Sequence, residues 1–163
     1  MEPVELILAV YPDPQRAPEV LKRLRLQQAE RKLKVFDAAA VCRDARGTTS
    51  VSDEGDLDAR RGSLFGAIVG GLIGLLGGPA GMVVGAAAGA ATGGLVAHST
   101  DLGFDQKMVN QVKETVQPGT SVMLVLVERP WAESVAQFLD QAEARVFRGL
   151  LKDDLVKRLQ SND

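Results

Sequence analysis

The spacing of glycine is the feature that most restricts how this chain can fold. Between Arg61 and Asp101 there is no charged residue unless His98 is protonated, and twelve of the chain's seventeen glycines lie in this stretch. Two rows repeat at four-residue intervals: Gly62, Gly66, Gly70, Gly74 and Gly78, then Gly77, Gly81, Gly85, Gly89 and Gly93. The Gly-Gly-Pro sequence at 77–79 predicts a turn between them. We therefore expect a helical hairpin formed by residues 62–76 and 80–97.

A four-residue repeat places the glycines in a stripe along one side of each helix, because the helix turns every 3.6 residues. Two such stripes let the backbones approach closely, with dispersion and Cα–H···O contacts in place of side-chain packing. Each glycine inside a helix costs roughly 1 kcal/mol relative to alanine, so an isolated hairpin would fray in water. The helices therefore need either a bilayer, which forbids unpaired backbone groups, or burial by neighbouring copies.

The two expected helices differ in how well they suit lipid. They are about 22 and 27 Å long, a little less than the roughly 30 Å hydrocarbon core of a bilayer. The first has large apolar side chains that we expect to face lipid: Leu64, Phe65, Ile68, Val69, Leu72, Ile73, Leu75 and Leu76. The second is rich in Gly and Ala and favours contact with protein. We predict membrane insertion, spanning or re-entrant, with burial inside a water-soluble oligomer as the alternative.

The flanking sequence predicts one α+β domain that the glycine segment interrupts. Strand candidates occupy residues 4–11, 35–43, 48–52, 120–128 and 145–150, of which 4–11 and 120–128 are apolar runs and 48–52 is short and weak. Helical patterns occupy 14–33, 104–116, a stretch that begins at Pro130, and 153–160. The order β-α-β-β, insertion, α-β-α-β is that of a ferredoxin-like sheet with an extra αβ unit. We expect residues 1–60 and 101–163 to form the two halves of this domain and residues 61–100 to form the hairpin.

The first and fourth of these strands are apolar on both faces. Helices on one side of the sheet alone would leave the other side as an open apolar surface. We expect such a surface to support self-association.

The residue inventory argues against several functions. The net charge of −2, with nearly matched acids and bases, gives no overall basic field for binding nucleic acid. The single cysteine, Cys42, forbids an intrachain disulfide, and the acidic start of the chain does not resemble a secretory signal. No lysine follows the glycines as a phosphate loop requires, and His98 lacks His or Cys partners for a metal. We expect no catalytic residue, no cofactor and no metal site, and any small-molecule ligand stays undefined.

Two stretches of the chain resemble a bacterial family. They are the Arg60-Arg61-Gly62 entry to the glycine segment, with Gly66 and Gly70 after it, and the run from Lys113 through Pro118-Gly119-Thr120-Ser121 to Val127. Both resemble the family catalogued as domain of unknown function 1269, over nearly the whole chain. The resemblance implies a membrane protein without an assigned activity, and it carries no catalytic residues to transfer.

These expectations describe a non-enzymatic protein that forms homo-oligomers through its glycine-zipper hairpins. We expect it at the cytoplasmic membrane with the sheet domain in the cytosol, where it would act as a pore or a membrane-organising scaffold. The alternative is a water-soluble cytoplasmic homo-oligomer, such as a stress-related cage or filament, with the hairpins in its core. An enzyme with its site at a subunit interface is a third hypothesis.

Overall fold

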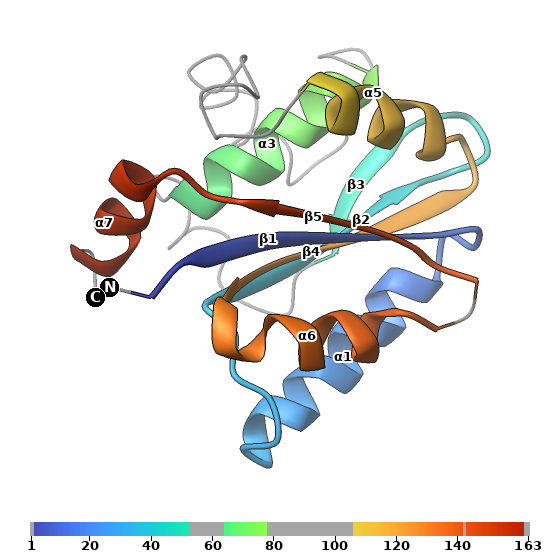
Figure 1. Ribbon diagram of the computed structural model, residues 1–163. Helices are drawn as coiled ribbons and strands as arrows, with labels where there is room; N and C mark the ends of the chain where they lie inside the picture. The colour runs from blue at the N-terminus through green and yellow to red at the C-terminus, as the bar shows by residue number, and fades with distance from the viewer. Residues whose placement is uncertain (1, 53–63, 78–105, 142, 162–163) are drawn as a thin grey trace.

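A computed structural model describes residues 2–52, 64–77, 106–141 and 143–161 of the chain (Figure 1). These residues form an α+β fold. The strands are β1 (Val4–Tyr11), β2 (Asp37–Arg43), β3 (Thr49–Ser52), β4 (Thr120–Glu128) and β5 (Arg145–Leu150). The helices are α1 (Arg16–Ala29), α3 (Leu64–Gly77), α5 (Gln106–Thr115), α6 (Arg129–Leu139) and α7 (Asp153–Ser161). The α+β class and the predicted order of these elements are confirmed.

The five strands form one antiparallel sheet in the order β3-β2-β4-β1-β5. Strand β4 lies between β1 and β2, with Val4 opposite Glu128 on one side and Asp37 opposite Leu126 on the other. The segments before and after the glycine-rich region therefore build a single sheet, since the central strand of one segment pairs with two strands of the other.

Alternation along the central strands divides the core into two clusters, one on each face of the sheet. In β1, Leu6 and Leu8 belong to one cluster, whereas Ile7, Ala9 and Tyr11 belong to the other. Successive side chains of a strand point to opposite faces, so an apolar run of this kind requires cover on both sides.

Helices α1 and α6 cover one face of the sheet (Figure 1). Two buried hydroxyls fix them there. The Ser121 hydroxyl accepts a hydrogen bond from the Ala17 N–H (3.0 Å) and donates one to the Asp13 carbonyl (2.6 Å) at the start of α1. The Tyr11 hydroxyl donates to the Leu139 carbonyl (2.7 Å) at the end of α6. Both helices are thus attached at defined points as well as by apolar packing.

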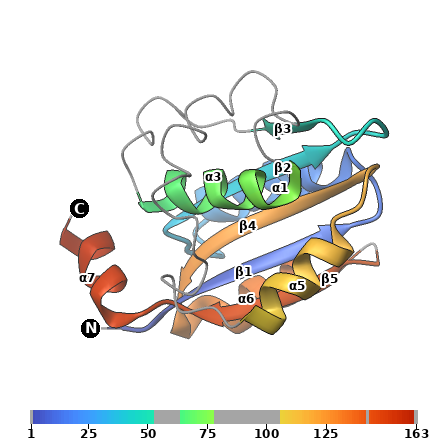
Figure 2. The ribbon, with the colours of Figure 1, turned by 90° about the horizontal axis from the view of Figure 1, so that it is seen from above.

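Helices α3, α5 and α7 contribute to the cluster on the opposite face. Figure 2 shows α3 lying over the half of the sheet that contains β2, and α5 lying toward β5. The expectation of an open apolar face is therefore wrong. The apolar residues of both faces are buried, because α3, from the first half of the glycine segment, helps to cover the second face.

An ion-pair network joins β1, β5 and α6. The Arg148 guanidinium lies 2.9 Å from a carboxylate oxygen of Glu5 and 2.8 Å from one of Glu133. These hydrogen bonds raise the pKa of Arg148 and lower the pKa of Glu133. The Glu5 carboxylate is mostly buried and is stabilised there by its cation, as a buried charge requires.

Candidate self-association surface

Helix α3 consists of fourteen residues without a single polar side chain. Its large side chains form one stripe in the core cluster: Phe65, Ile68, Val69, Leu72, Ile73 and Leu76. The spacing i, i+3, i+4, i+7, i+8 and i+11 is that of a helix face directed at a core. The helix contacts β2 and β3, and also α7.

Most of the residues predicted to face lipid therefore lie in the core of the domain. The exposed fraction is 2% for Phe65, 4% for Ile68, 8% for Leu72 and 7% for Leu76. Leu64 is half-buried and packs against the same cluster. Leu75 belongs to α3, but its side chain is outside the described ones. In this arrangement the stripe is buried against the sheet and does not form an outer surface of the domain.

The glycine row of α3 lies on a different side of the helix. Gly66 is half-buried, Gly70 is buried and Gly74 is exposed. A four-residue step advances about 40° beyond a full turn, so the row starts beside the sheet-facing stripe and rotates outward along the helix. A methyl group placed on Gly74 would meet no atom within 4 Å. We call Gly66, Gly70 and Gly74 the glycine face.

The rest of the predicted glycine pattern falls outside the described residues. This holds for Gly62, Gly78, Gly81, Gly85, Gly89 and Gly93, and for the second helix expected over 80–97. Helix α3 is described as far as Gly77, and the turn predicted at 77–79 runs beyond the described residues.

Residues with catalytic or metal-binding potential are scattered in the described part of the chain. No group of three or more His, Cys, Asp or Glu residues within it is arranged to hold a metal ion. Cys42 lies half-buried in β2, where burial raises the pKa of its thiol and so favours the unreactive protonated form. Trp131 and Phe138 of α6 are partly buried and pack against the apolar cluster on that face of the sheet.

Among the described residues, no helix combines the length and the apolar character that crossing a membrane requires. Helix α3 is the most apolar of the described helices, and its described part comprises fourteen residues.

Comparison with known proteins adds one finding to this geometry. A family model described as "Protein of unknown function (DUF1269)" matches residues 63–162, which is more than half of the chain. The chain belongs to the DUF1269 family. The matched part begins next to α3 and ends after α7, so it covers less than the nearly complete resemblance expected from the sequence. Neither the curated proteins nor the solved structures contain a match.

The position of the family match has a structural consequence. The matched part of this DUF1269 chain contains β4 and β5, whereas β1 and β2, between which β4 lies, precede it. The matched part therefore has the helices of the α3 face but lacks most of the sheet that these helices cover.

Sequence reasoning missed the role of the α3 stripe as a cover for the sheet. Two signals together indicate it: strands that are apolar on both faces, and a helix whose large side chains recur at core spacing. The stripe alone could not decide the matter, because lipid and the face of a sheet offer the same kind of apolar surroundings to a helix.

Proposed function

We propose that this protein is a non-enzymatic, membrane-associated assembly protein whose copies contact one another through the glycine face of α3. The observation that carries the proposal is the division of this helix into two sides. Its large side chains are buried against the sheet. Its glycine row begins beside them at the half-buried Gly66, continues through the buried Gly70 and ends at the exposed Gly74. The helix therefore covers the core with its large side chains and exposes a glycine, Gly74, at which another backbone can approach.

The energetic cost of the glycine face favours a close partner on it. In water, alanine at each of these positions would favour the helix by about 1 kcal/mol, and a charged side chain would add solubility. What glycine offers instead is close approach of a second helix, stabilised by dispersion and Cα–H···O contacts. A second copy presents the same face, so a two-fold symmetric contact needs no other partner.

Membrane association belongs to the proposal because of the charge-free composition of residues 62–100. We place the assembly at the cytoplasmic membrane with the sheet domain in the cytosol. A scaffold is favoured over a pore, because the large side chains of α3 are already used within the sheet domain. A water-soluble homo-oligomer would use the same glycine face and would differ in its location.

The proposal also includes a ferredoxin-like core. The order β2-β4-β1-β5, with α1 and α6 on one face, supports this assignment. Strand β3 and helices α3 and α5 then belong to an insertion between β2 and β4.

The test of assembly is sedimentation of the Gly74→Leu variant. Gly74 is exposed and its added Cβ would meet nothing beyond its own helix, so a leucine there can point outward and would hold a second backbone away. We therefore expect a smaller assembly than that of the wild type at equal concentration. Gln137→Leu is the matched control, because it adds the same side chain to an exposed position of α6 on the other face. A wild type that is monomeric, or a Gly74→Leu assembly of unchanged size, would contradict the proposal.

Location is tested separately by high-speed centrifugation of a detergent-free lysate. We expect the protein in the membrane pellet. Recovery of all of it as a defined soluble oligomer would replace the membrane scaffold with the water-soluble alternative.

A further inference from the structure

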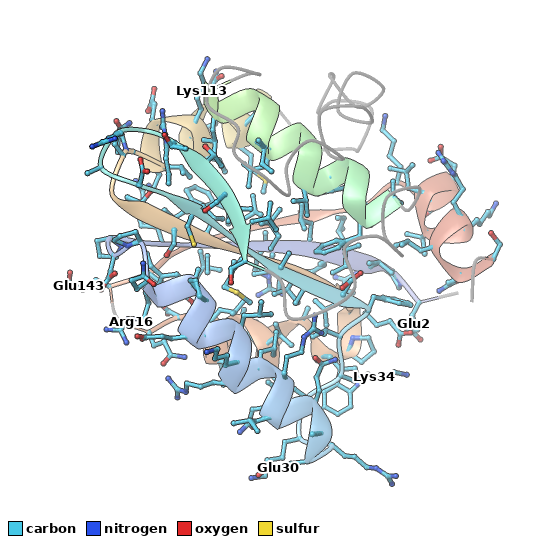
Figure 3. All side chains as sticks on the ribbon, turned by 180° about the vertical axis from the view of Figure 1, so that it is seen from behind. Glu2, Arg16, Glu30, Lys34, Lys113 and Glu143 are labelled. Atoms are coloured by element: carbon cyan, nitrogen blue, oxygen red, sulfur yellow. The ribbon has the colours of Figure 1, made fainter. Side chains whose placement is uncertain are left out.

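Positive charge is concentrated on α1 and the turn that follows it. Residues 16–34 contain seven basic and two acidic side chains, a formal charge of +5, whereas the whole chain has a charge of −2. Figure 3 shows Arg16 at one end of α1 and Glu30 at the other, and in Figure 1 the latter end projects away from the sheet. More than half of this charge lies along α1, and the protruding end carries Glu30, Arg31, Lys32 and Lys34, a formal charge of +2, on the face of the sheet opposite α3.

The acids near this end do not cancel its charge. Glu30 pairs with Lys32 (2.7 Å) at this end and Asp37 pairs with Arg25 (3.9 Å), whereas Glu19 pairs with Arg16 (3.2 Å) at the other end of α1. The surplus is carried by other exposed basic side chains, among which Arg31 and Lys34 follow the end of the helix. Leu33 between these two is buried and holds the turn against the core.

An exposed leucine lies on the outer side of the same helix. Leu26 is 62% exposed, while Leu24, only two residues before it, is completely buried. Two residues correspond to about 200° of helical rotation, so Leu26 points away from the core. A single exposed leucine is ordinary on a protein surface, but here it lies within two turns of the basic side chains.

The backbone at Arg31 supplies an independent observation. Its φ is 59°, in the left-handed region that glycine adopts without strain, and its N–H donates to the Gln28 carbonyl (3.0 Å) to close the helix. This backbone turn directs the chain away from α1 at the point where the exposed Arg31 side chain begins the turn that leads to Lys34.

We infer that this basic tip, defined as Leu26, Arg31, Lys32 and Lys34, binds the anionic headgroup surface of a bilayer. The inference deepens the membrane association proposed above but does not depend on the glycine face. Charge complementarity favours an anionic partner, because basic clusters on a helix are attracted to acidic lipid headgroups. Leu26 favours lipid over nucleic acid, since an apolar side chain gains free energy on entering the interfacial region of a bilayer.

The location of the tip makes the two surfaces compatible. Helix α1 packs in one core cluster and α3 in the other, so they lie on opposite faces of the sheet. A molecule that contacts lipid through the tip therefore keeps its glycine face available to another copy.

The experiment measures binding of the full chain to vesicles of phosphatidylcholine with and without 30% phosphatidylglycerol, at about 0.1 M salt. Each basic side chain near an anionic surface contributes roughly fivefold to partitioning. The double variant Arg31→Asn/Lys34→Gln should therefore bind the anionic vesicles about 25-fold more weakly than the wild type. Asn is chosen at position 31 because it tolerates the left-handed conformation. Leu26→Ser should weaken binding several-fold.

The matched control is Lys113→Gln/Lys157→Gln, which removes two exposed lysines from helices on the opposite face. Binding by this control should stay within twofold of the wild type. Equal losses in the two double variants, no loss in the tip variant, or tighter binding to a short DNA duplex than to anionic vesicles would overturn the inference.

Two further outcomes separate this inference from the proposed function. Equal binding of the wild type to both kinds of vesicle would overturn the basic tip and leave membrane association intact. In the second outcome, the wild type binds neither kind of vesicle, yet it assembles and Gly74→Leu reduces that assembly. This result would overturn the basic tip and leave the glycine-face contact intact.

Discussion

The two faces of the β-sheet are covered in physically different ways. On the face of α1 and α6, buried hydroxyls of Ser121 and Tyr11 attach each helix at a defined point. On the other face, α3 has no polar side chain and is placed by apolar packing. Hydrogen bonds are directional, whereas the hydrophobic effect is not. Helices α1 and α6 are therefore fixed at defined points, whereas α3 is required only to be an apolar cover of suitable shape. Helix α5, on the same face as α3, is attached by a hydrogen bond from the Arg43 guanidinium to the Val116 carbonyl (2.7 Å).

The outer surfaces of the same helices differ in parallel. Helix α1 turns charged side chains outward, as a helix exposed to water usually does. Helix α3 exposes Gly74, and glycine neither solubilises a helix nor favours it. The outer side of α1 therefore suits contact with water, whereas the exposed Gly74 of α3 suits the close approach of another protein backbone.

The largest expected effect tests whether α3 is as much a part of the core as α1. Phe65→Ala removes a ring that is 2% exposed, and Leu24→Ala removes a completely buried side chain of α1. Truncation of a buried Phe or Leu costs about 3–5 and 2–5 kcal/mol, respectively. We expect both variants to lose several kcal/mol of unfolding free energy in urea denaturation. A loss below about 1 kcal/mol for Phe65→Ala alone would mean that α3 is not packed on the sheet in solution.

The second prediction concerns the hydrogen bond between the Tyr11 hydroxyl and the Leu139 carbonyl of α6, which a rise in pH should break. Burial, and then the negative charge of Asp140, raise the pKa of Tyr11 well above its usual value, while Arg16 and Arg23 oppose this more weakly. Above pH 10 the unfolded chain loses the tyrosine proton and the folded chain keeps it. The free energy of unfolding should then fall by about 1.4 kcal/mol per pH unit, or 2–3 kcal/mol by pH 12.

Tyr11 is the chain's single tyrosine, so tyrosinate absorbance reports its ionisation directly. It should appear together with unfolding. The control is Tyr11→Phe, which loses about 1 kcal/mol at neutral pH with the hydrogen bond to Leu139 but should lack this part of the alkaline slope. Ionisation near pH 10 in a protein that is still folded would show that the hydroxyl is accessible to water.

Much of the fold could be predicted because local signals agree with it. The bounds of β1 and β4 match the apolar runs at 4–11 and 120–128, which Pro12 and Pro118-Gly119 delimit. The last strand, β5, also has its predicted bounds. In these segments, length, composition and turn residues all favour the same structure, so no tertiary contact was needed to identify them.

The remaining features depend on contacts between distant segments. Nothing near Ser121 in the sequence indicates that its hydroxyl caps α1, more than a hundred residues earlier. The pairing of Glu5 with Arg148 across β1 and β5 is equally remote in sequence. The large side chains of α3 were assigned to lipid because hydropathy measures how apolar a surface is and does not identify what covers it.

The smallest expected effect concerns the glycine face in a chain that has not assembled. Gly74→Ala adds a methyl group where no atom lies within 4 Å, at a helical position, so it should raise the unfolding free energy by up to about 1 kcal/mol. Gly119→Ala is the matched control: its added methyl also meets no atom within 4 Å, but its φ of +86° should make the substitution destabilising by about 1 kcal/mol. Denaturation at a concentration where sedimentation shows monomers measures both. A Gly74→Ala variant that is less stable under these conditions would mean that another segment of the same chain already closes on this face, which would leave no room for a second copy.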